Sequence, residues 1–214
     1  RFSTTSLATG NDLNLKYQDL AFKLNFPTSK VGTFSIWGLG LIDRNKAPIE
    51  ERSKWETLGD RQAGENRLEK MVGGLAHKYV MNENTYIRSS LSATYSKDHT
   101  VVDQLADDKL IRVGDIRNSR WDFVFNSYLN TKFSPRHTNR TITNLHYDLD
   151  YQVSRYFGLN RPMEQISKGD GESTVFSAYS SSVINLNNNW DTSLGVTAQY
   201  FTLNNNLSIE PRVA

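Results

Sequence analysis

The side chains best placed to do chemistry lie in the stretch TITNLHYDLDY, residues 141–151. His146, Asp148 and Asp150 occupy every second position there, so in an extended strand all three side chains lie on one face. An imidazole and two carboxylates on one face could bind a cation or a polar solute. The alternative is a hydrated surface whose polar groups bond to one another or to a covering domain.

A second polar face precedes this one, in WDFVFNSYLNTKF, residues 121–133. The two stretches together predict one polar surface made of seven side chains: Asp122, Asn126, Asn130, Lys132, His146, Asp148 and Asp150. If the strands belong to a barrel, these residues line its lumen.

Motifs for catalysis are missing from the sequence. The chain has no Cys, which excludes thiol nucleophiles, disulfides and Cys-based zinc sites. His77, His99 and His137 lack the His-Glu-x-x-His spacing of a metal site. The segment 168–172, KGDGE, lacks the Gly-Lys-Ser/Thr ending of a P-loop and is expected to be a surface loop. We therefore expect no enzyme activity, no metal and no cofactor.

Each polar face is one side of a strand whose other side is apolar. Residues 121–133 place five large side chains on the apolar side: Trp121, Phe123, Phe125, Leu129 and Phe133. Residues 141–151 place four there: Leu145, Tyr147, Leu149 and Tyr151. Two alternating stretches joined by a short polar turn predict an antiparallel hairpin.

The same alternation recurs along the chain. It predicts about nine strands, the others within 19–26, 33–42, 74–81, 85–97, 173–186, 190–200 and from 207 onward. Short turns are expected near 27–32, 82–84, 134–139 and 187–189. Long polar connections, expected to be loops, lie near 43–70, 97–119 and 152–172.

Strand length separates two kinds of β protein. Several predicted strands run about ten residues or more, the length a tilted strand needs to cross a bilayer, whereas ordinary strands run ~5–6 residues. Long one-sided strands, with short turns at one end and long loops at the other, indicate an outer-membrane barrel. The predicted fold is all-β, an antiparallel up-and-down transmembrane β-barrel. Residues 1–214 are expected to form one barrel segment without a plug domain.

Average composition hides this pattern. Hydrophobic residues make up 37% of the chain, and 25 Lys+Arg against 23 Asp+Glu leave a net charge of +2. A barrel wall keeps every second residue polar, so low average hydrophobicity is compatible with outer-membrane lipid as a partner. The balanced charge predicts no nucleic-acid partner, because such partners require a clustered basic excess.

Aromatic side chains near the predicted strand ends could form the two interfacial girdles of such a barrel. The predicted girdles consist of Phe133, Trp190 and Tyr200 toward the short turns, and of Trp37, Trp121 and Tyr151 toward the long loops. The alternative is that these aromatics belong to the core or rim of a soluble β protein.

Residues 19–44, DLAFKLNFPTSKVGTFSIWGLGLIDR, and 190–212, WDTSLGVTAQYFTLNNNLSIEPR, resemble the barrel of TonB-dependent outer-membrane receptors. The group most similar carries an N-terminal carboxypeptidase-regulatory-like domain. The resemblance covers most of the chain and lies in strands and turns. It implies a barrel of roughly 22 strands around a plug. It also implies uptake of a nutrient such as a siderophore, glycan or peptide, a periplasmic TonB-type energy transducer that acts through the plug, and a surface lipoprotein partner.

About nine strands are too few for that barrel, so we expect these residues to be an internal portion of a larger receptor in the bacterial outer membrane. Two alternatives stay open. One is a small complete outer-membrane barrel with a structural role, which needs an even strand count. The other is a soluble β-rich module that binds a ligand such as carbohydrate through exposed aromatic residues.

Overall fold

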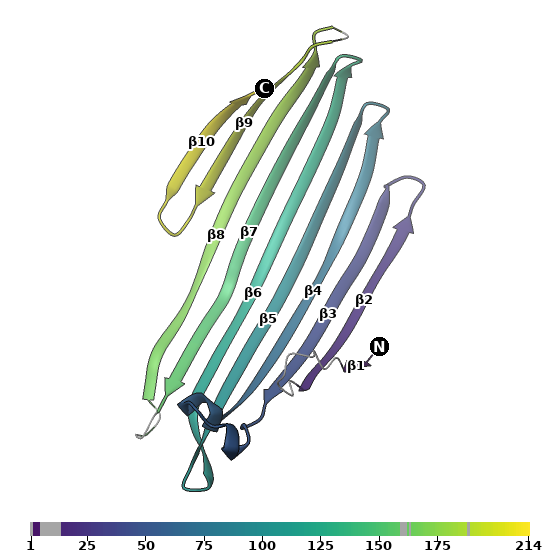
Figure 1. Cartoon of the computed structure of the whole chain (residues 1–214). Helices are drawn as coiled ribbons and strands as arrows, with labels where there is room; N and C mark the ends of the chain where they lie inside the picture. The colour runs from purple at the N-terminus through teal and green to yellow at the C-terminus, as the bar shows by residue number, and fades with distance from the viewer. Residues whose placement is uncertain (1, 5–13, 159–161, 163, 188) are drawn as a thin grey trace.

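The computed structural model describes residues 2–4, 14–158, 162, 164–187 and 189–214, and side chains from residue 18 onward except 150–153 (Figure 1). Ten strands form one sheet in which each strand is hydrogen-bonded to its neighbours in sequence, and every pair is antiparallel. The prediction of an all-β, antiparallel up-and-down arrangement is confirmed. The described strands form an open sheet, with β1 at one edge and β10 at the other.

The nine predicted strands all occur, and one short strand, β1, is added at the start. Their bounds are β1 Phe2–Thr4, β2 Asn14–Pro27, β3 Thr33–Ala47, β4 Gln62–Asn82, β5 Thr85–Ala106, β6 Lys109–Ser134, β7 His137–Phe157, β8 Glu164–Asn185, β9 Asp191–Phe201 and β10 Asn206–Val213. Two 3-10 turns, η1 Arg52–Lys54 and η2 Leu58–Arg61, lie in the β3–β4 connection. Among the described residues no helix has the length and apolar character needed to cross a bilayer.

The predicted loops near 97–119 and 152–172 are largely strand, so that part of the prediction is wrong. Strand β5 continues to Ala106 and β6 begins at Lys109, joined by a tight turn in which Asp107 and Asp108 have φ of 48° and 56°. Residues 168–172 likewise lie inside β8. Polar and charged side chains on both faces of these segments hide the alternation that reveals a half-buried strand.

One face of the sheet is apolar across its whole width; we call it the apolar face. A central row crosses it with one large side chain from each of nine strands: Leu24, Ile36, Leu75, Leu91, Phe125, Leu145, Phe176, Tyr200 and Leu207. Because paired residues of an antiparallel sheet point to the same face, the register alone builds this row.

The opposite face, the polar face, carries the side chains between these positions. Strand β6 presents Asp122, Asn126 and Asn130 there, and β7 presents His146 and Asp148. The two faces of one strand therefore differ in polarity.

A conventional core is missing from the part of the chain that the structure describes. The sheet is a single layer, with no second layer of strands or helices over either face (Figure 1). Val113, 6% exposed, is the one buried hydrophobic residue described, whereas Phe125, Phe176 and most other members of the central row are exposed. The apolar face thus needs a cover outside the described chain.

The β3–β4 connection is ordered by contacts around Trp55. The Trp55 indole Nε1 donates to the Glu50 carbonyl at 2.8 Å, and the Arg52 and Arg61 guanidinium groups lie 5.6 and 5.0 Å from its ring centroid. Arg52 also pairs with Asp108 in the β5–β6 turn. The connection is therefore attached to the end of the sheet opposite the short turns (Figure 1).

Candidate functional site

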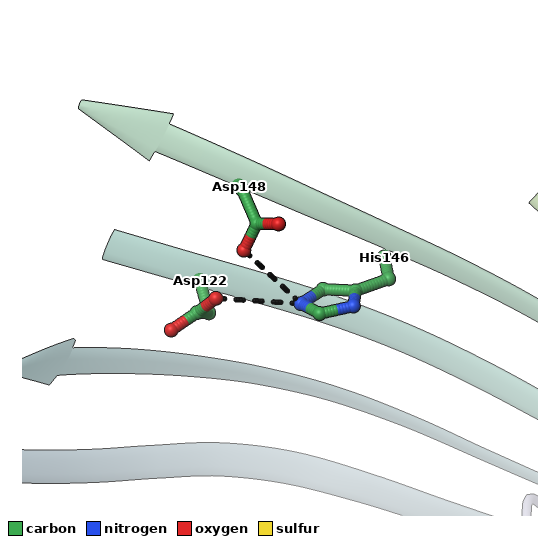
Figure 2. A group of neighbouring side chains, drawn as sticks. All are labelled: Asp122, His146 and Asp148. Atoms are coloured by element: carbon green, nitrogen blue, oxygen red, sulfur yellow. Dashed lines mark hydrogen bonds and ion pairs between the residues drawn. The ribbon is translucent and has the colours of Figure 1, made fainter. Parts of the chain in front are cut away.

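Three side chains meet on the polar face of β6 and β7 (Figure 2). His146 Nε2 lies 3.3 Å from Asp122 Oδ1 and 3.3 Å from Asp148 Oδ1, so the imidazole stands between two carboxylates. We call these three residues the Asp–His cluster. The sequence had placed all three on a polar face, and the pairing of β6 with β7 brings them into contact.

The register explains why these residues meet. Asp122 and Asp148 are direct partners across β6 and β7, and His146 stands opposite Val124, one position diagonal to Asp122. Two carboxylates directly opposite each other repel, so the pair needs positive charge nearby.

Arg120 supplies that charge, and sequence reasoning missed it. Its guanidinium lies 2.7 Å from Asp122 Oδ1 and 2.5 Å from Asp148 Oδ1, and Ser173 Oγ on β8 donates to Asp148 Oδ2 at 3.1 Å. Arg120 stands two positions before Asp122, which is the spacing of a same-face neighbour in a strand. This two-residue spacing is the signal in the sequence that would have placed Arg120 beside Asp122. The bonded group therefore ties three neighbouring strands together.

A divalent metal is the chemical alternative for the cluster. One ligand atom from each of Asp122, His146 and Asp148 lies within 4.8 Å of the others. The same two Oδ1 atoms, however, already accept from Arg120. A metal would have to displace the guanidinium, so the arrangement is better suited to an ion-pair network than to a metal centre.

The remaining predicted polar residues extend along the same face toward the short turns. Asn126 pairs with Ser90 and Asn144, and Asn130 with Tyr86 and Arg140. Lys132 is exposed near the end of β6. Asp150 lies in β7 beside a register shift between Asp148 and Tyr151, and its side chain is outside the described residues.

The aromatic residues predicted to form girdles do not share one face. Trp121 is on the apolar face, with its ring centroid 4.8 Å from that of Tyr95. Trp37 is instead on the polar face near the short-turn end of β3, where its ring lies against Gly74. Its predicted place in a long-loop girdle is therefore wrong, because the alternation of β3 points the side chain the other way.

The other predicted girdle residues divide as follows. Phe133 and Trp190 are exposed beside short turns, and Phe133 stacks on His137 with centroids 5.0 Å apart. Tyr200 lies at the opposite end of β9 from Trp190, where its hydroxyl donates to Asn205 Oδ1 at 2.8 Å. Tyr200 therefore lies beside a short turn, the one between β9 and β10, but not at the same end of the sheet as Phe133 and Trp190. The Tyr151 side chain is outside the described residues.

The comparisons with known proteins identify no relative. No protein-family model matches the chain, and no curated protein is similar enough to it to count as one. The features that bear on function are therefore the two faces of the sheet and the side chains on them.

Proposed function

We propose that this chain forms part of the wall of an outer-membrane transport barrel of the TonB-dependent receptor type. The observation that carries the proposal is the central row of the apolar face, which continues through nine strands with most of its side chains exposed. Exposed apolar patches of this extent are rare on soluble monomers. Acyl chains are a solvent in which such a face is stable.

The height of the apolar face supports lipid as the cover. Trp121 and Phe133 lie twelve positions apart in β6, or ~40 Å along the strand and ~30 Å at the ~40° tilt of barrel strands. Immediately beyond the row of Trp121 the same face becomes charged. Glu69 stands opposite Lys97 there, and Arg67 stands opposite His99. An abrupt change from apolar to charged is expected where a strand leaves the hydrocarbon.

Polar side chains on the apolar face near the short turns are bonded to one another. Asn139 Nδ2 donates to Ser182 Oγ at 3.0 Å, Thr141 Oγ1 donates to Asn139 Oδ1 at 3.1 Å, and the hydroxyls of Ser89 and Ser127 lie 3.0 Å apart. Satisfied polar groups cost far less in an apolar medium than unpaired ones. These residues are therefore compatible with a place close to the membrane interface.

In this proposal the polar face lines the lumen. A nutrient passes along it, a plug and a TonB-type transducer control passage, and a surface lipoprotein is a further partner. The Asp–His cluster then stabilises the lumen side of β6–β8. The family resemblance in residues 19–44 and 190–212 supports the transport role.

Two tryptophans on opposite faces test the proposal directly. The chain has four, at positions 37, 55, 121 and 190, so Trp→Phe changes can leave only Trp121 or only Trp37. Each protein is refolded into vesicles. Lipids brominated on their acyl chains should quench the fluorescence of Trp121, while aqueous iodide should quench the fluorescence of Trp37. Each protein serves as the control for the other.

The competing soluble binding module predicts a different result. In that case neither tryptophan is quenched by brominated lipid, and the protein stays monodisperse without detergent. That outcome would overturn the membrane-wall proposal.

A further inference from the structure

Charge is distributed unevenly along the polar face. Trp37 belongs to a row of register partners that crosses the polar face from β2 to β7. From this row to the short turns, the face carries five exposed cations: Lys23, Lys78, Arg88, Lys132 and Arg140. The strand residues of that part include no Asp or Glu. The acidic residues of the face begin one row further on, at Asp122 and Asp148.

These five cations form no ion pair with any residue that the structure describes. Lys78 Nζ lies 5.8 Å from the Tyr86 ring centroid. Some other cations of the sheet are paired, as Arg120 is with two carboxylates, whereas Lys70 and Lys97 form no ion pair among the described residues. What distinguishes the five cations is that they gather on a part of the polar face whose strand residues include no carboxylate.

Three of the five cations surround a hollow of about 620 Å³ on β2–β5. We call it the cationic hollow; its polar and aromatic lining includes Lys23, Ser35, Trp37, Lys78, Arg88 and Ser90. The Trp37 ring covers Gly74, where a Cβ atom would stand 2.8 Å from Trp37 Cζ2. Glycine thus lets the indole lie flat against the sheet. A hollow of this volume matches a small-molecule site.

We propose that the cationic hollow binds a small multivalent anion that carries phosphate or carboxylate groups. Two ammonium groups and a guanidinium around one space repel one another, and an anion with two or more negative charges removes that repulsion. Arg88 can bind such a group through two N–H donors, and the lysines act as point charges. The inference rests on the proposed function in one respect, namely that the polar face lines a water-filled lumen.

The position of the hollow favours a small anion over an acidic segment of a covering domain. Lys132 and Arg140 lie on β6 and β7, outside the lining of the hollow. A protein segment laid across this face would engage all five cations, whereas a small anion would engage only the three on β2–β5.

The test compares two pairs of neutralised cations in the full chain refolded in detergent micelles. Pyrophosphate and citrate are the probes, because one carries phosphate and the other carboxylate groups. Binding is measured by calorimetry and by Trp37 fluorescence in the protein that retains only this tryptophan. The double variant Lys78→Gln/Arg88→Gln should bind about 100-fold more weakly, roughly tenfold for each cation removed. The matched control Lys132→Gln/Arg140→Gln removes the same charge from the same face and should bind within about threefold of the parent protein.

Two results would overturn the inference. Equal weakening in both double variants would mean that a diffuse positive field, not the hollow, attracts the anions. Binding of a poly-glutamate peptide without binding of either small anion would assign the cations to an acidic protein segment.

The two proposals can fail separately. Quenching of Trp121 by brominated lipid without binding of either probe would support the membrane wall and contradict the anion site. Anion binding that depends on Lys78 and Arg88, without quenching of Trp121 by brominated lipid, would support the anion site and contradict the lumen.

Discussion

Asp122 and Asp148 face each other across two strands, which is an unfavourable place for like charges. The side chains are partly buried, with Asp122 16% exposed, so water screens their repulsion incompletely. Arg120 bonds to both carboxylates, and His146 stands between them. The stability of this part of the sheet should therefore depend on the single guanidinium.

We expect Arg120→Gln to lower the free energy of unfolding by about 1–3 kcal/mol, because it leaves two opposed carboxylates without their shared cation. Urea titration in micelles measures the loss. The double variant Arg120→Gln/Asp122→Asn should recover most of it, since one of the two like charges is gone. An equal loss in the single and double variants would contradict this account. Stabilisation of the unmodified protein by a divalent cation would show instead that metal displaces Arg120.

Asp115 provides a second residue-level prediction, near the charged end of the strands. Arg117 donates to both carboxylate oxygens, at 3.0 and 2.8 Å, and His99 Nε2 lies 3.0 Å from Oδ1. The hydrogen bonds from Arg117, and to a smaller extent from His99, hold the pKa of Asp115 below its ordinary value, against the opposing effect of burial.

Because the pKa is lower in the folded state, Asp115 stabilises the fold above its unfolded pKa of ~3.9. This contribution is lost as the pH falls through the lower, folded pKa. The free energy of unfolding, measured between pH 5 and pH 3, should therefore fall less steeply in Asp115→Asn than in the parent protein. Identical slopes would exclude a role for Asp115 in acid sensitivity.

The β2–β3 hairpin depends on one glycine. Gly32 has φ of 89°, and a Cβ atom there would lie 2.2 Å from the Lys78 carbonyl oxygen on β4. Thr28 bonds to the Gly32 carbonyl through its backbone N–H at 2.9 Å and through its hydroxyl at 2.7 Å. Both the backbone conformation and the space therefore require glycine.

We expect Gly32→Ala to destabilise the protein by about 1–3 kcal/mol, through positive φ and the contact with β4. Gly169→Ala in β8 is the matched control, because no heavy atom lies within 4 Å of its would-be Cβ. The control should be neutral or stabilising by up to ~1 kcal/mol. Thermal unfolding of both variants decides the comparison, and similar losses would contradict the turn-specific explanation.

For the whole molecule, neighbouring residues on opposite faces offer the sharpest prediction. Phe125 belongs to the central row of the apolar face, and Asn126 points to the polar face. On the proposed membrane wall, Phe125→Lys should reduce the stability of the protein in vesicles by about 2–4 kcal/mol, the cost of a lysine in the middle of a lipid-facing barrel surface. Asn126→Lys adds the same charge to the polar face and should change stability by less than ~1 kcal/mol.

The measurement is the free energy of unfolding from vesicles, together with the fraction of each protein that inserts. Comparable losses in the two variants would show that the faces do not meet different solvents. A severe loss for Phe125→Lys in a protein that never enters vesicles would point to a soluble core at this face.

The strands, their antiparallel order and the two faces follow from the sequence because alternation is a local pattern with a period of two residues. The polar positions of Asp122, His146 and Asp148 follow from the same pattern. Local information failed where that pattern stopped. The sequence predicts a loop at the charged extensions of β5 and β6, although their backbones stay hydrogen-bonded to each other up to the turn at Asp107 and Asp108.

Cross-strand register supplied everything that depends on neighbours far apart in sequence. It placed Arg120 against Asp148, set Trp37 opposite Gly74 and gathered Lys23, Lys78 and Arg88 around one hollow. A shift of one residue in pairing would send each of these side chains to the other face. Alternation tells which residues of one strand share a face, whereas contact between strands exists only once the turns and pairings have set the register.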